Sequence, residues 1–309
     1  MLEEKIEHAQ NVLKVALKLS STYYHKPIVI CYSGGKDSDI LLDIAIKTLN
    51  KEDFIVLNSH TTLDAPETVY YIRNKFKKLT ELGYTCVVKY PYYKGKRTSF
   101  WDLCYQKREL PTRLFRFCCR YLKEVATPKQ IACTGVREDE SQNREGRNEF
   151  GIRNNRKIYK SAQHVNVMID FDTDTKNNSS FECEIIKGAK KNKDMIVNPI
   201  YNFTAEDVKQ YVNTILLNIN PLYSKGYTRV GCIGCPMANK QRYKQFKDYP
   251  QIKLNIQRLC NKIIGDGHSK YKTMDFKSGE DLFRWWMGED YKQLRLDDLL
   301  KGGEVTCIE

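Results

Sequence analysis

An apolar stretch, a glycine-rich turn and a helix-like stretch follow one another near the start of the chain. Residues 27–31 are apolar, residues 33–38 read Ser-Gly-Gly-Lys-Asp-Ser, and residues 40–46 have the apolar pattern of a helix. Two glycines allow a sharp turn whose N–H groups come close to a ligand, and the first turn of a helix presents unpaired N–H donors at the positive end of its dipole. The sequence therefore predicts a loop that binds phosphate.

The spacing within this turn excludes the Walker type of phosphate-binding loop. A Walker loop needs a longer segment between its first glycine and the Gly-Lys-Ser/Thr, whereas here Gly34, Gly35 and Lys36 are consecutive. The pattern that remains is the PP-loop. In it, Lys36 supplies a positive charge, and Ser33 and Ser38 supply hydroxyl donors.

Strand-like and helix-like stretches alternate along the first half of the chain, with strands expected near residues 27–32, 54–58, 86–90 and 130–135. This alternation predicts an α/β fold, a Rossmann-like parallel sheet with helices on both faces. Ligands of such sheets bind at the carboxyl ends of the strands. The turn at Ser33 and the segment 59–64 should therefore meet in one crevice.

Three regions are expected: an N-terminal helix (residues 1–24), a nucleotide-binding domain (25–237) and a helical C-terminal subdomain (238–309). Residues 151–198 break the alternation, and turn residues at 177–180 between two strand-like stretches predict a β-hairpin insertion. Thr204 and Ser278 begin patterns typical of capping boxes, so helices should start near both, and residues 239–264 form a further helical stretch.

Four segments of the chain, in the same order, resemble the phosphoadenosine phosphosulfate (PAPS) reductase family of the PP-loop adenine-nucleotide α-hydrolase superfamily. They are the turn at 33–38, the stretch 60–68 that ends in Pro-Glu-Thr, the Gly-x-Arg segment at 135–141 followed by Arg144, and the stretch 220–227 that begins Asn-Pro-Leu-Tyr. The resemblance extends over roughly residues 26–237 and implies an adenine-nucleotide α-hydrolase-like fold.

The resemblance implies an adenine nucleotide as ligand, either ATP or a sulfonucleotide (adenylyl sulfate or PAPS), together with Mg²⁺. The residues that it assigns to nucleotide binding are Ser33, Gly34, Gly35, Lys36, Asp37, Ser38, His60, Thr61, Gly135 and Arg137. Lys36, Asp37, Arg137 and Arg144 are also candidate catalytic residues. In this assignment the cations neutralise phosphate charge, and Asp37 orients the loop or the magnesium ion.

Eleven cysteines and no secretion signal favour a reducing compartment and metal or redox chemistry. Cys118 and Cys119 are adjacent, and Cys232 and Cys235 form a Cys-x-x-Cys turn. Soft thiolates favour iron–sulfur clusters or zinc. The set resembles the [4Fe–4S] ligands of adenylyl-sulfate reductases and the four cysteines of DNA-phosphorothioation ATPases. A [4Fe–4S] cluster is predicted, and zinc is the alternative.

Cys307 is the third residue from the end of the sequence. Sulfonucleotide reductases carry a nucleophilic cysteine on a C-terminal tail, which makes Cys307 a candidate nucleophile. Their tail motif is Glu-Cys-Gly-x-His, and neither the glycine nor the histidine is present here. A reactive thiolate also needs an activating environment, which the sequence does not display.

A formal net charge of +13 predicts a polyanionic ligand or partner. Two interpretations stay open: a surface that steers nucleotides, and a surface that binds nucleic acid. No stretch has the length of a membrane span or the pattern of a signal peptide, so the sequence predicts a cytoplasmic protein with no membrane partner. A sulfur or electron donor protein is a further expected partner, and the oligomeric state is not indicated.

The sequence favours a PP-loop enzyme that cleaves ATP between its α- and β-phosphates, adenylylates an acceptor and releases pyrophosphate during sulfur transfer. The acceptor expected from the charge is nucleic acid. A sulfonucleotide reductase that releases sulfite is the second hypothesis, with Cys307 as its nucleophile. A nucleotide-sensing or DNA-binding module without turnover is the third.

Overall fold

The computed structural model describes residues 1–123, 127, 129–140, 149–152, 185, 187–191, 193–215, 218–267 and 276–289. The chain divides into two compact units: unit 1 comprises Met1–Thr98 and Cys119–Cys232, and unit 2 comprises Ser99–Cys118 and Ile233–Glu309. Unit 2 thus includes Ser99–Cys118, which the sequence analysis places in the nucleotide-binding domain. The N-terminal helix is part of the core of unit 1.

Unit 1 is an α/β fold around a six-stranded sheet of order β3-β2-β1-β6-β8-β7. The strands are β1 (Ile28–Cys31), β2 (Phe54–Ser59), β3 (Thr85–Lys89), β6 (Ile131–Cys133), β7 (Phe150–Ile152) and β8 (Met195–Val197). The first four match the predicted strands, and β3, β2, β1, β6 and β8 run parallel. The Rossmann-like parallel arrangement is therefore confirmed.

Strand β7 departs from the parallel arrangement, because it pairs antiparallel with β8 at the edge of the sheet. Strand β7 lies at the start of the predicted insertion, residues 151–198, and β8 lies near its end. A chain that leaves and returns at one edge without a crossover pairs antiparallel. The turn and most of the two strand-like stretches expected for the hairpin lie outside the described residues, and residues 187–190 are helical.

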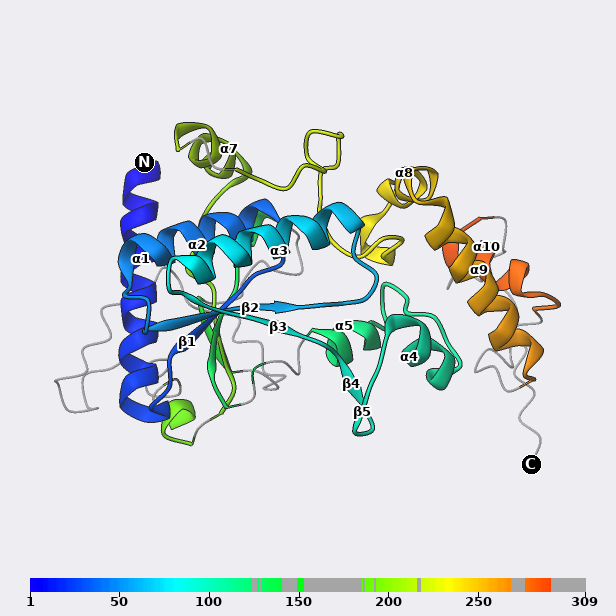
Figure 1. Ribbon diagram of the computed structural model, residues 1–309, viewed down its shortest axis with the longest axis horizontal. Coiled ribbons are helices and arrows are strands. Elements are labelled where there is room, and N and C mark those ends of the chain that lie inside the picture. Colours follow the sequence, from blue (N-terminus) through cyan, green and yellow to red (C-terminus); the bar gives the residue numbers. More distant parts are fainter. Residues whose placement is uncertain are drawn as a thin grey trace, which may run out of the picture. The chain divides into compact units, whose positions relative to one another are not determined.

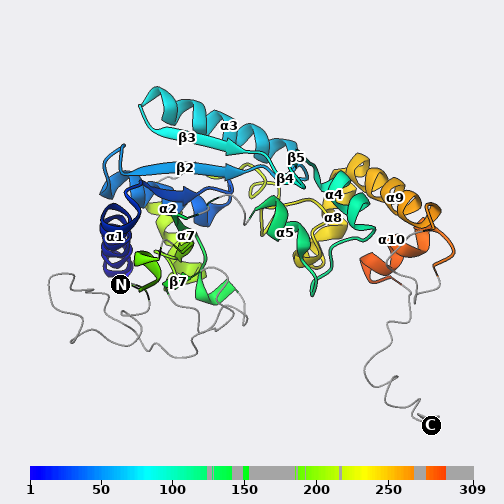
Figure 2. The ribbon, with the colours of Figure 1, turned by 90° about the horizontal axis from the view of Figure 1, so that it is seen from below.

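Helices α1 (Leu2–Leu19), α2 (Lys36–Thr48), α3 (Pro66–Glu81) and α7 (Ala205–Thr214) share one apolar core with the sheet. Helices α2 and α3 lie side by side over one face of β1, β2 and β3 (Figures 1 and 2). Side chains alternate along a strand, so Ile28, Ile30 and Val56 point to this covered face and are fully buried. A π-helix, Ser20–Tyr24, extends α1.

Short elements connect these layers in unit 1. Strands β4 (Tyr92–Tyr93) and β5 (Lys96–Arg97) form a small antiparallel hairpin after β3. Helix α5 (Phe117–Leu122), whose first two residues belong to unit 2, precedes β6. A 3₁₀ turn, Glu138–Glu140, follows β6. The capping box predicted at Thr204 is confirmed, because its hydroxyl accepts a hydrogen bond from Asp207 N and starts α7.

Unit 2 is helical, with α4 (Phe100–Lys107), α8 (Gln241–Asp248), α9 (Pro250–Gly265), α10 (Gly279–Met287) and a 3₁₀ turn, Pro236–Ala238. Pro250 divides the helical stretch expected over residues 239–264, because its ring cannot continue a helix and is tolerated at a first turn. Ser278 caps α10 as expected. The indole of Trp286 donates to Pro111 O at 2.7 Å and ties Ser99–Cys118 into this unit.

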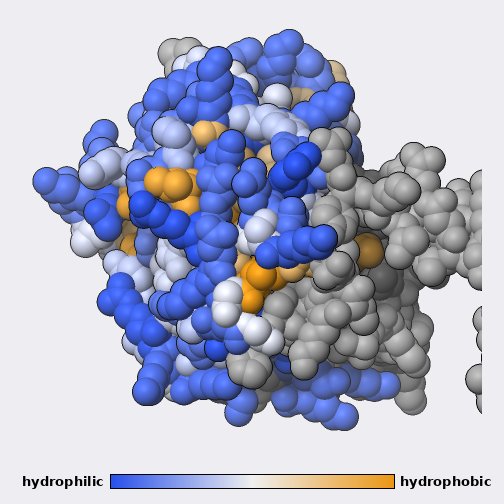
Figure 3. All heavy atoms as spheres, turned by 90° about the vertical axis from the view of Figure 1, so that its right-hand side faces the viewer, coloured by the Kyte–Doolittle hydropathy of each residue, from blue (hydrophilic) through white to orange (hydrophobic). Residues whose placement is uncertain are grey.

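Figure 3 shows one face of the molecule, on which the coloured residues are mostly hydrophilic and hydrophobic side chains form small separate patches. Within the described residues, no helix combines the length and apolar character needed to span a membrane.

Close packing of α9 against α10 gives a test of unit 2. A Cβ added at Gly279, the first residue of α10, would overlap the backbone and side chain of Asn261 on α9. We expect Gly279→Ala to lower the free energy of unfolding by about 1–3 kcal/mol, the usual cost of overpacking. Denaturant unfolding measures this. Gly265→Ala is the control, because no atom lies within 4 Å of its added Cβ; equal stability of the two variants would contradict the packing.

Candidate functional site

The glycine turn begins where β1 ends, and backbone contacts with β2 hold its first residue. Tyr32 N–H donates to Leu57 O at 2.8 Å, and the side-chain amide of Asn58 donates to Tyr32 O at 2.9 Å. Gly34 has a φ of +74°, and a Cβ there would lie 2.9 Å from Ile72 Cγ1. This position therefore requires glycine both for its backbone angle and for the approach of α3.

Hydrogen bonds within the turn close it around the start of α2. Gly35 is the N-cap residue, and Ser38 Oγ donates to Gly35 O at 2.7 Å. Ser33 contacts the same hydroxyl through its N–H at 3.3 Å and its Oγ at 3.2 Å. Ser38 is only 4% exposed, and its hydroxyl stabilises the turn through these hydrogen bonds. The sequence does not predict these contacts.

Lys36 is the first residue of α2 and brings two positive features to the turn. Its backbone N–H donates to the phenol oxygen of Tyr223 at 3.0 Å, and its ammonium lies 5.8 Å from the centre of that ring. No carboxylate pairs with Lys36 within the part of the chain that the structure describes. The ammonium and the helix N-terminus together favour an anionic ligand.

Arg137 lies beside the turn and forms an ion pair with it. Its Nε donates to Asp37 Oδ1 at 2.7 Å, while its Nη1 donates to Asp139 and, at 3.1 Å, to Phe203 O. The residue is 5% exposed. Its guanidinium thus orients Asp37, and in this state its charge is balanced by two carboxylates.

Gly135 lets the end of β6 approach the start of α2. A Cβ at this position would lie 2.9 Å from the backbone C and O of Asp37 and 3.1 Å from Ser38 N. The structure therefore brings the Gly-x-Arg segment and the PP-loop together. Their common role in nucleotide binding stays a prediction.

Asp39, one residue beyond the motif, forms a buried polar cluster behind the turn. Its Oδ1 contacts Tyr32 Oη at 2.6 Å, Tyr71 Oη at 2.9 Å and Lys75 Nζ at 3.0 Å. Its side chain has no exposed surface, and burial raises the pKa of this carboxyl against the opposing effect of Lys75. The cluster ties the first turn of α2 to the end of β1 and to α3.

His60 and Thr61 follow β2 but face different surroundings. His60 lines a small cavity of about 40 Å³ with Asn58 and Asp64, and burial lowers the pKa of its imidazole. Thr61 is 2% exposed, and its hydroxyl accepts hydrogen bonds from Leu63 N and, at 3.3 Å, from Cys232 Sγ. Thr61 thus contacts Leu63 and Cys232 in this state. The roles predicted for His60 and Thr61 in nucleotide binding stay predictions.

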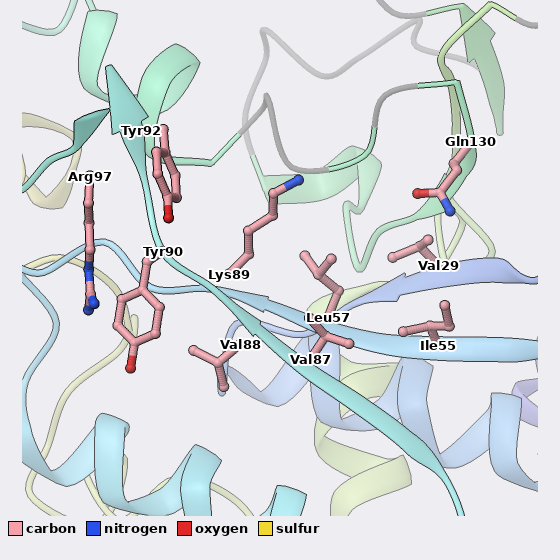
Figure 4. A pocket seen from close by; sticks show the side chains of 10 residues that line it. All are labelled: Val29, Ile55, Leu57, Val87, Val88, Lys89, Tyr90, Tyr92, Arg97 and Gln130. Atoms are coloured by element: carbon pink, nitrogen blue, oxygen red, sulfur yellow. The ribbon is translucent and has the colours of Figure 1, made fainter. Parts of the chain in front are cut away.

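A larger cavity of about 490 Å³ lies along the strands of unit 1 (Figure 4). Apolar side chains of three neighbouring strands form its floor, and its polar side chains come from β3, the β4–β5 hairpin and the start of β6. The lining residues are Val29, Ile55, Leu57, Val87, Val88, Lys89, Tyr90, Tyr92, Arg97 and Gln130. Two lining residues are cationic and none is acidic, and the Arg97 guanidinium lies 3.8 Å from the centre of the Tyr90 ring.

The four cysteines of the predicted cluster are divided between the units: Cys119 and Cys232 belong to unit 1, and Cys118 and Cys235 to unit 2. Within unit 1, both cysteine segments contact the end of β2. Thr61 contacts Cys232, and Ser59 Oγ donates at 3.5 Å to Lys123 O, four residues after Cys119. The described residues contain no group of three or more His, Cys, Asp or Glu side chains arranged to hold a metal ion. The cluster stays a prediction, and Arg144 and Cys307 lie outside the described residues.

A family model described as the phosphoadenosine phosphosulfate reductase domain matches residues 27–238. The chain belongs to this family. The matched range includes the PP-loop, the Gly-x-Arg segment, the stretch 220–227 and all four cysteines of the predicted cluster.

Individual relatives are distant. The uncharacterized protein MJ0973 of Methanocaldococcus jannaschii is 23% identical over 258 residues, which cover 81% of this chain and 53% of that protein. An adenosine 5'-phosphosulfate reductase of Anoxybacillus flavithermus is 23% identical over 225 residues, which cover 69% of this chain and 74% of that enzyme. The chain spans about half the length of the first two curated relatives that it matches, 53% and 40%.

Among solved structures, the PAPS reductase of Candida auris in a phosphate complex is similar, with a TM-score of 0.44 and 16% sequence identity. The match covers 75% of this chain and 93% of that one.

Asn220 and Tyr223 contact the PP-loop, and the sequence analysis gives neither a role. The Asn220 side-chain amide donates at 3.1 Å both to Gly34 O and to Thr68 Oγ1. These residues are far from the turn in the chain, and only their place in a family-like segment marks them. Asp39 has no signal of its own, because an acidic residue in the first turn of a helix is ordinary.

Gly135 provides a test of the loop geometry. We expect Gly135→Ala to displace the backbone of residues 37–38 and to weaken pyrophosphate binding at least about tenfold, because the added methyl overlaps main-chain atoms. Isothermal titration measures the affinity. Gly151→Ala in β7 is the control, since its Cβ meets no atom within 4 Å. Unchanged affinity in Gly135→Ala would show that this contact does not shape the site.

Proposed function

We propose that this chain binds ATP at the PP-loop and cleaves it between the α- and β-phosphates. An acceptor oxygen attacks the α-phosphorus, the bond from that phosphorus to the bridging oxygen breaks, and pyrophosphate leaves with the electron pair. The products are an adenylylated acceptor and pyrophosphate. Adenylylation activates the acceptor for sulfur transfer.

One observation carries this proposal: Lys36, at the N-terminus of α2, has an ammonium with no carboxylate partner among the described residues. A leaving pyrophosphate gains negative charge as the bond breaks, and fixed donors stabilise this charge without reorganisation. Gly34 and Gly35 let main-chain N–H groups approach it. Arg137 acts indirectly here, because it holds Asp37 in place.

The nucleoside fits the cavity of Figure 4. Leu57 in its floor pairs in register with Cys31, the last residue of β1, so the cavity begins beside the entry to the turn. Its volume of about 490 Å³ suits a small-molecule ligand, and Tyr90 and Tyr92 offer rings for stacking.

The donor set also fits Mg²⁺. Asp37 presents Oδ1 to Arg137, and its Oδ2 has no hydrogen bond or ion pair within the described residues. Magnesium in nucleotide sites uses one or two carboxylates together with phosphate oxygens. Asp37 would hold the ion, which supplies charge neutralisation on the phosphates when bound.

A [4Fe–4S] cluster held by Cys118, Cys119, Cys232 and Cys235 is part of the proposal. The all-sulfur donor set suits such a cluster, and the contacts of both cysteine segments with the end of β2 support it. When bound, the cluster supplies sulfide or electrons; zinc is the alternative occupant. Nucleic acid is the proposed acceptor, which the net charge of +13 supports.

Lys36→Ala tests the reaction. With α-labelled ATP, Mg²⁺ and candidate acceptors, we expect the wild type to release AMP or adenylylated acceptor, and the variant to react at least about 100-fold more slowly, the usual cost of losing a fixed charge-stabilising donor. Lys47→Ala on the exposed end of α2 is the control. Equal rates for wild type and Lys36→Ala would refute the proposal.

Iron and acid-labile sulfide in anaerobically purified protein test the cluster. We expect wild type to contain both, with broad visible absorbance, and Cys232→Ser to lose most of each. Cys86→Ser is the control, since burial raises the pKa of that β3 thiol and disfavours the thiolate that a metal needs. If the wild-type protein contained zinc and no iron, the result would contradict the iron–sulfur cluster and support zinc as the bound metal.

The similarity to an adenosine 5'-phosphosulfate reductase favours a second candidate, reduction of a sulfonucleotide with release of sulfite. Cys307 would attack the sulfur atom, and a thioredoxin-like donor would supply the electrons. Sulfite release from adenylyl sulfate or PAPS, lost in Cys307→Ser, distinguishes this candidate from ATP cleavage.

A further inference from the structure

The backbone amide of Lys36, the first of α2, donates a hydrogen bond to the phenol oxygen of Tyr223. Among the described residues, no other side chain from outside the turn contacts this amide. The position of Tyr223 is fixed by its own segment. Leu222 N donates to Asn220 Oδ1 at 3.0 Å, while the Asn220 amide group donates to Gly34 O. Asn220 therefore fixes the segment that carries Tyr223, because Asn220 is itself hydrogen-bonded to the turn.

The hydrogen bonds of the phenol define what it can still do. Its oxygen accepts a hydrogen bond from the Lys36 N–H at 3.0 Å. A phenol can accept a hydrogen bond and also donate one. Its own proton has no acceptor among the described residues.

The surroundings of this proton match an anion. A Cβ at Gly35 would lie 3.5 Å from the phenol oxygen, which places the hydroxyl at the turn, and the Lys36 ammonium lies over the same ring. Burial raises the pKa of Tyr223 to about 12, so the phenol is neutral at physiological pH and remains a donor. Acceptance of the Lys36 amide hydrogen polarises the O–H and strengthens it as a donor.

We propose that the Tyr223 hydroxyl donates its proton in a hydrogen bond to a phosphate oxygen of the ligand. The phosphate oxygen is then bound by two kinds of donor, the hydroxyl of Tyr223 and the backbone amides of the turn. Tyr223 is then a ligand-contacting residue of the site. This inference rests on one part of the proposed function, namely that the ligand binds with a phosphate group at the PP-loop.

The opposite arrangement is a phenol that blocks the amide. In that case Tyr223 Oη would occupy the place of a phosphate oxygen and would have to leave before a ligand binds. The two arrangements predict opposite effects of removing the hydroxyl. A hydroxyl that donates strengthens binding, whereas a hydroxyl that blocks weakens it.

Pyrophosphate titrated by calorimetry into the full chain separates them. We expect Tyr223→Phe to bind pyrophosphate about tenfold more weakly than the wild type, since a hydrogen bond to a charged acceptor is lost while the ring beneath Lys36 remains. Tyr211→Phe is the matched control: it loses a buried phenol hydroxyl in the same unit, bonded to Asp43 at 2.7 Å, and should bind as the wild type does.

Equal or tighter binding by Tyr223→Phe would overturn the inference, and tighter binding would identify the phenol as a block. A wild type that does not bind pyrophosphate would overturn it as well. The titration requires no cleavage of ATP. A chain that binds pyrophosphate through Tyr223 but forms neither AMP nor adenylylated acceptor from ATP would therefore retain this inference and lose the proposed function.

Discussion

The ion pair between Asp37 and Arg137 is the interaction on which the site depends. It joins the first turn of α2 to the segment that follows β6, across the neighbouring strands β1 and β6. Removal of one partner from a largely buried pair costs about 3–5 kcal/mol, because the other charge is left uncompensated. Gly135 makes the pair possible, since only a residue without Cβ allows the two backbones to approach this closely.

This pairing also decides which charges are available to a ligand. Arg137 is balanced by Asp37 and Asp139, and Lys75 is balanced by the buried Asp39. The two carboxylates in the first turn of α2, Asp37 and Asp39, are therefore neutralised by cations outside the turn. In the proposed site, Lys36 and the helix N-terminus would therefore attract a ligand with little opposition from the acidic residues beside them, although the motif itself contains an aspartate.

The fold was predictable where the pattern is local. The strands near residues 28, 54, 85 and 131 and the caps at Thr204 and Ser278 follow from apolar runs and capping residues. The antiparallel β7 and the place of Ser99–Cys118 in unit 2 depend on tertiary pairing, which a local pattern does not encode. In the site, the turn was predictable, whereas the contact of Lys36 with Tyr223 joins residues 187 positions apart. Arg137 was recognised, but its pairing with Asp37 required the structure.

The segment from Tyr223 to Cys232 connects two predicted features of unit 1. At its start, the Tyr223 phenol lies on the first amide of α2; at its end, the Cys232 thiol contacts Thr61 after β2. Both anchors lie at the carboxyl ends of adjacent parallel strands, β1 and β2, because a parallel sheet gathers its strand ends at one edge. A single stretch of chain therefore contacts the PP-loop at one end and carries one cysteine of the predicted cluster at the other.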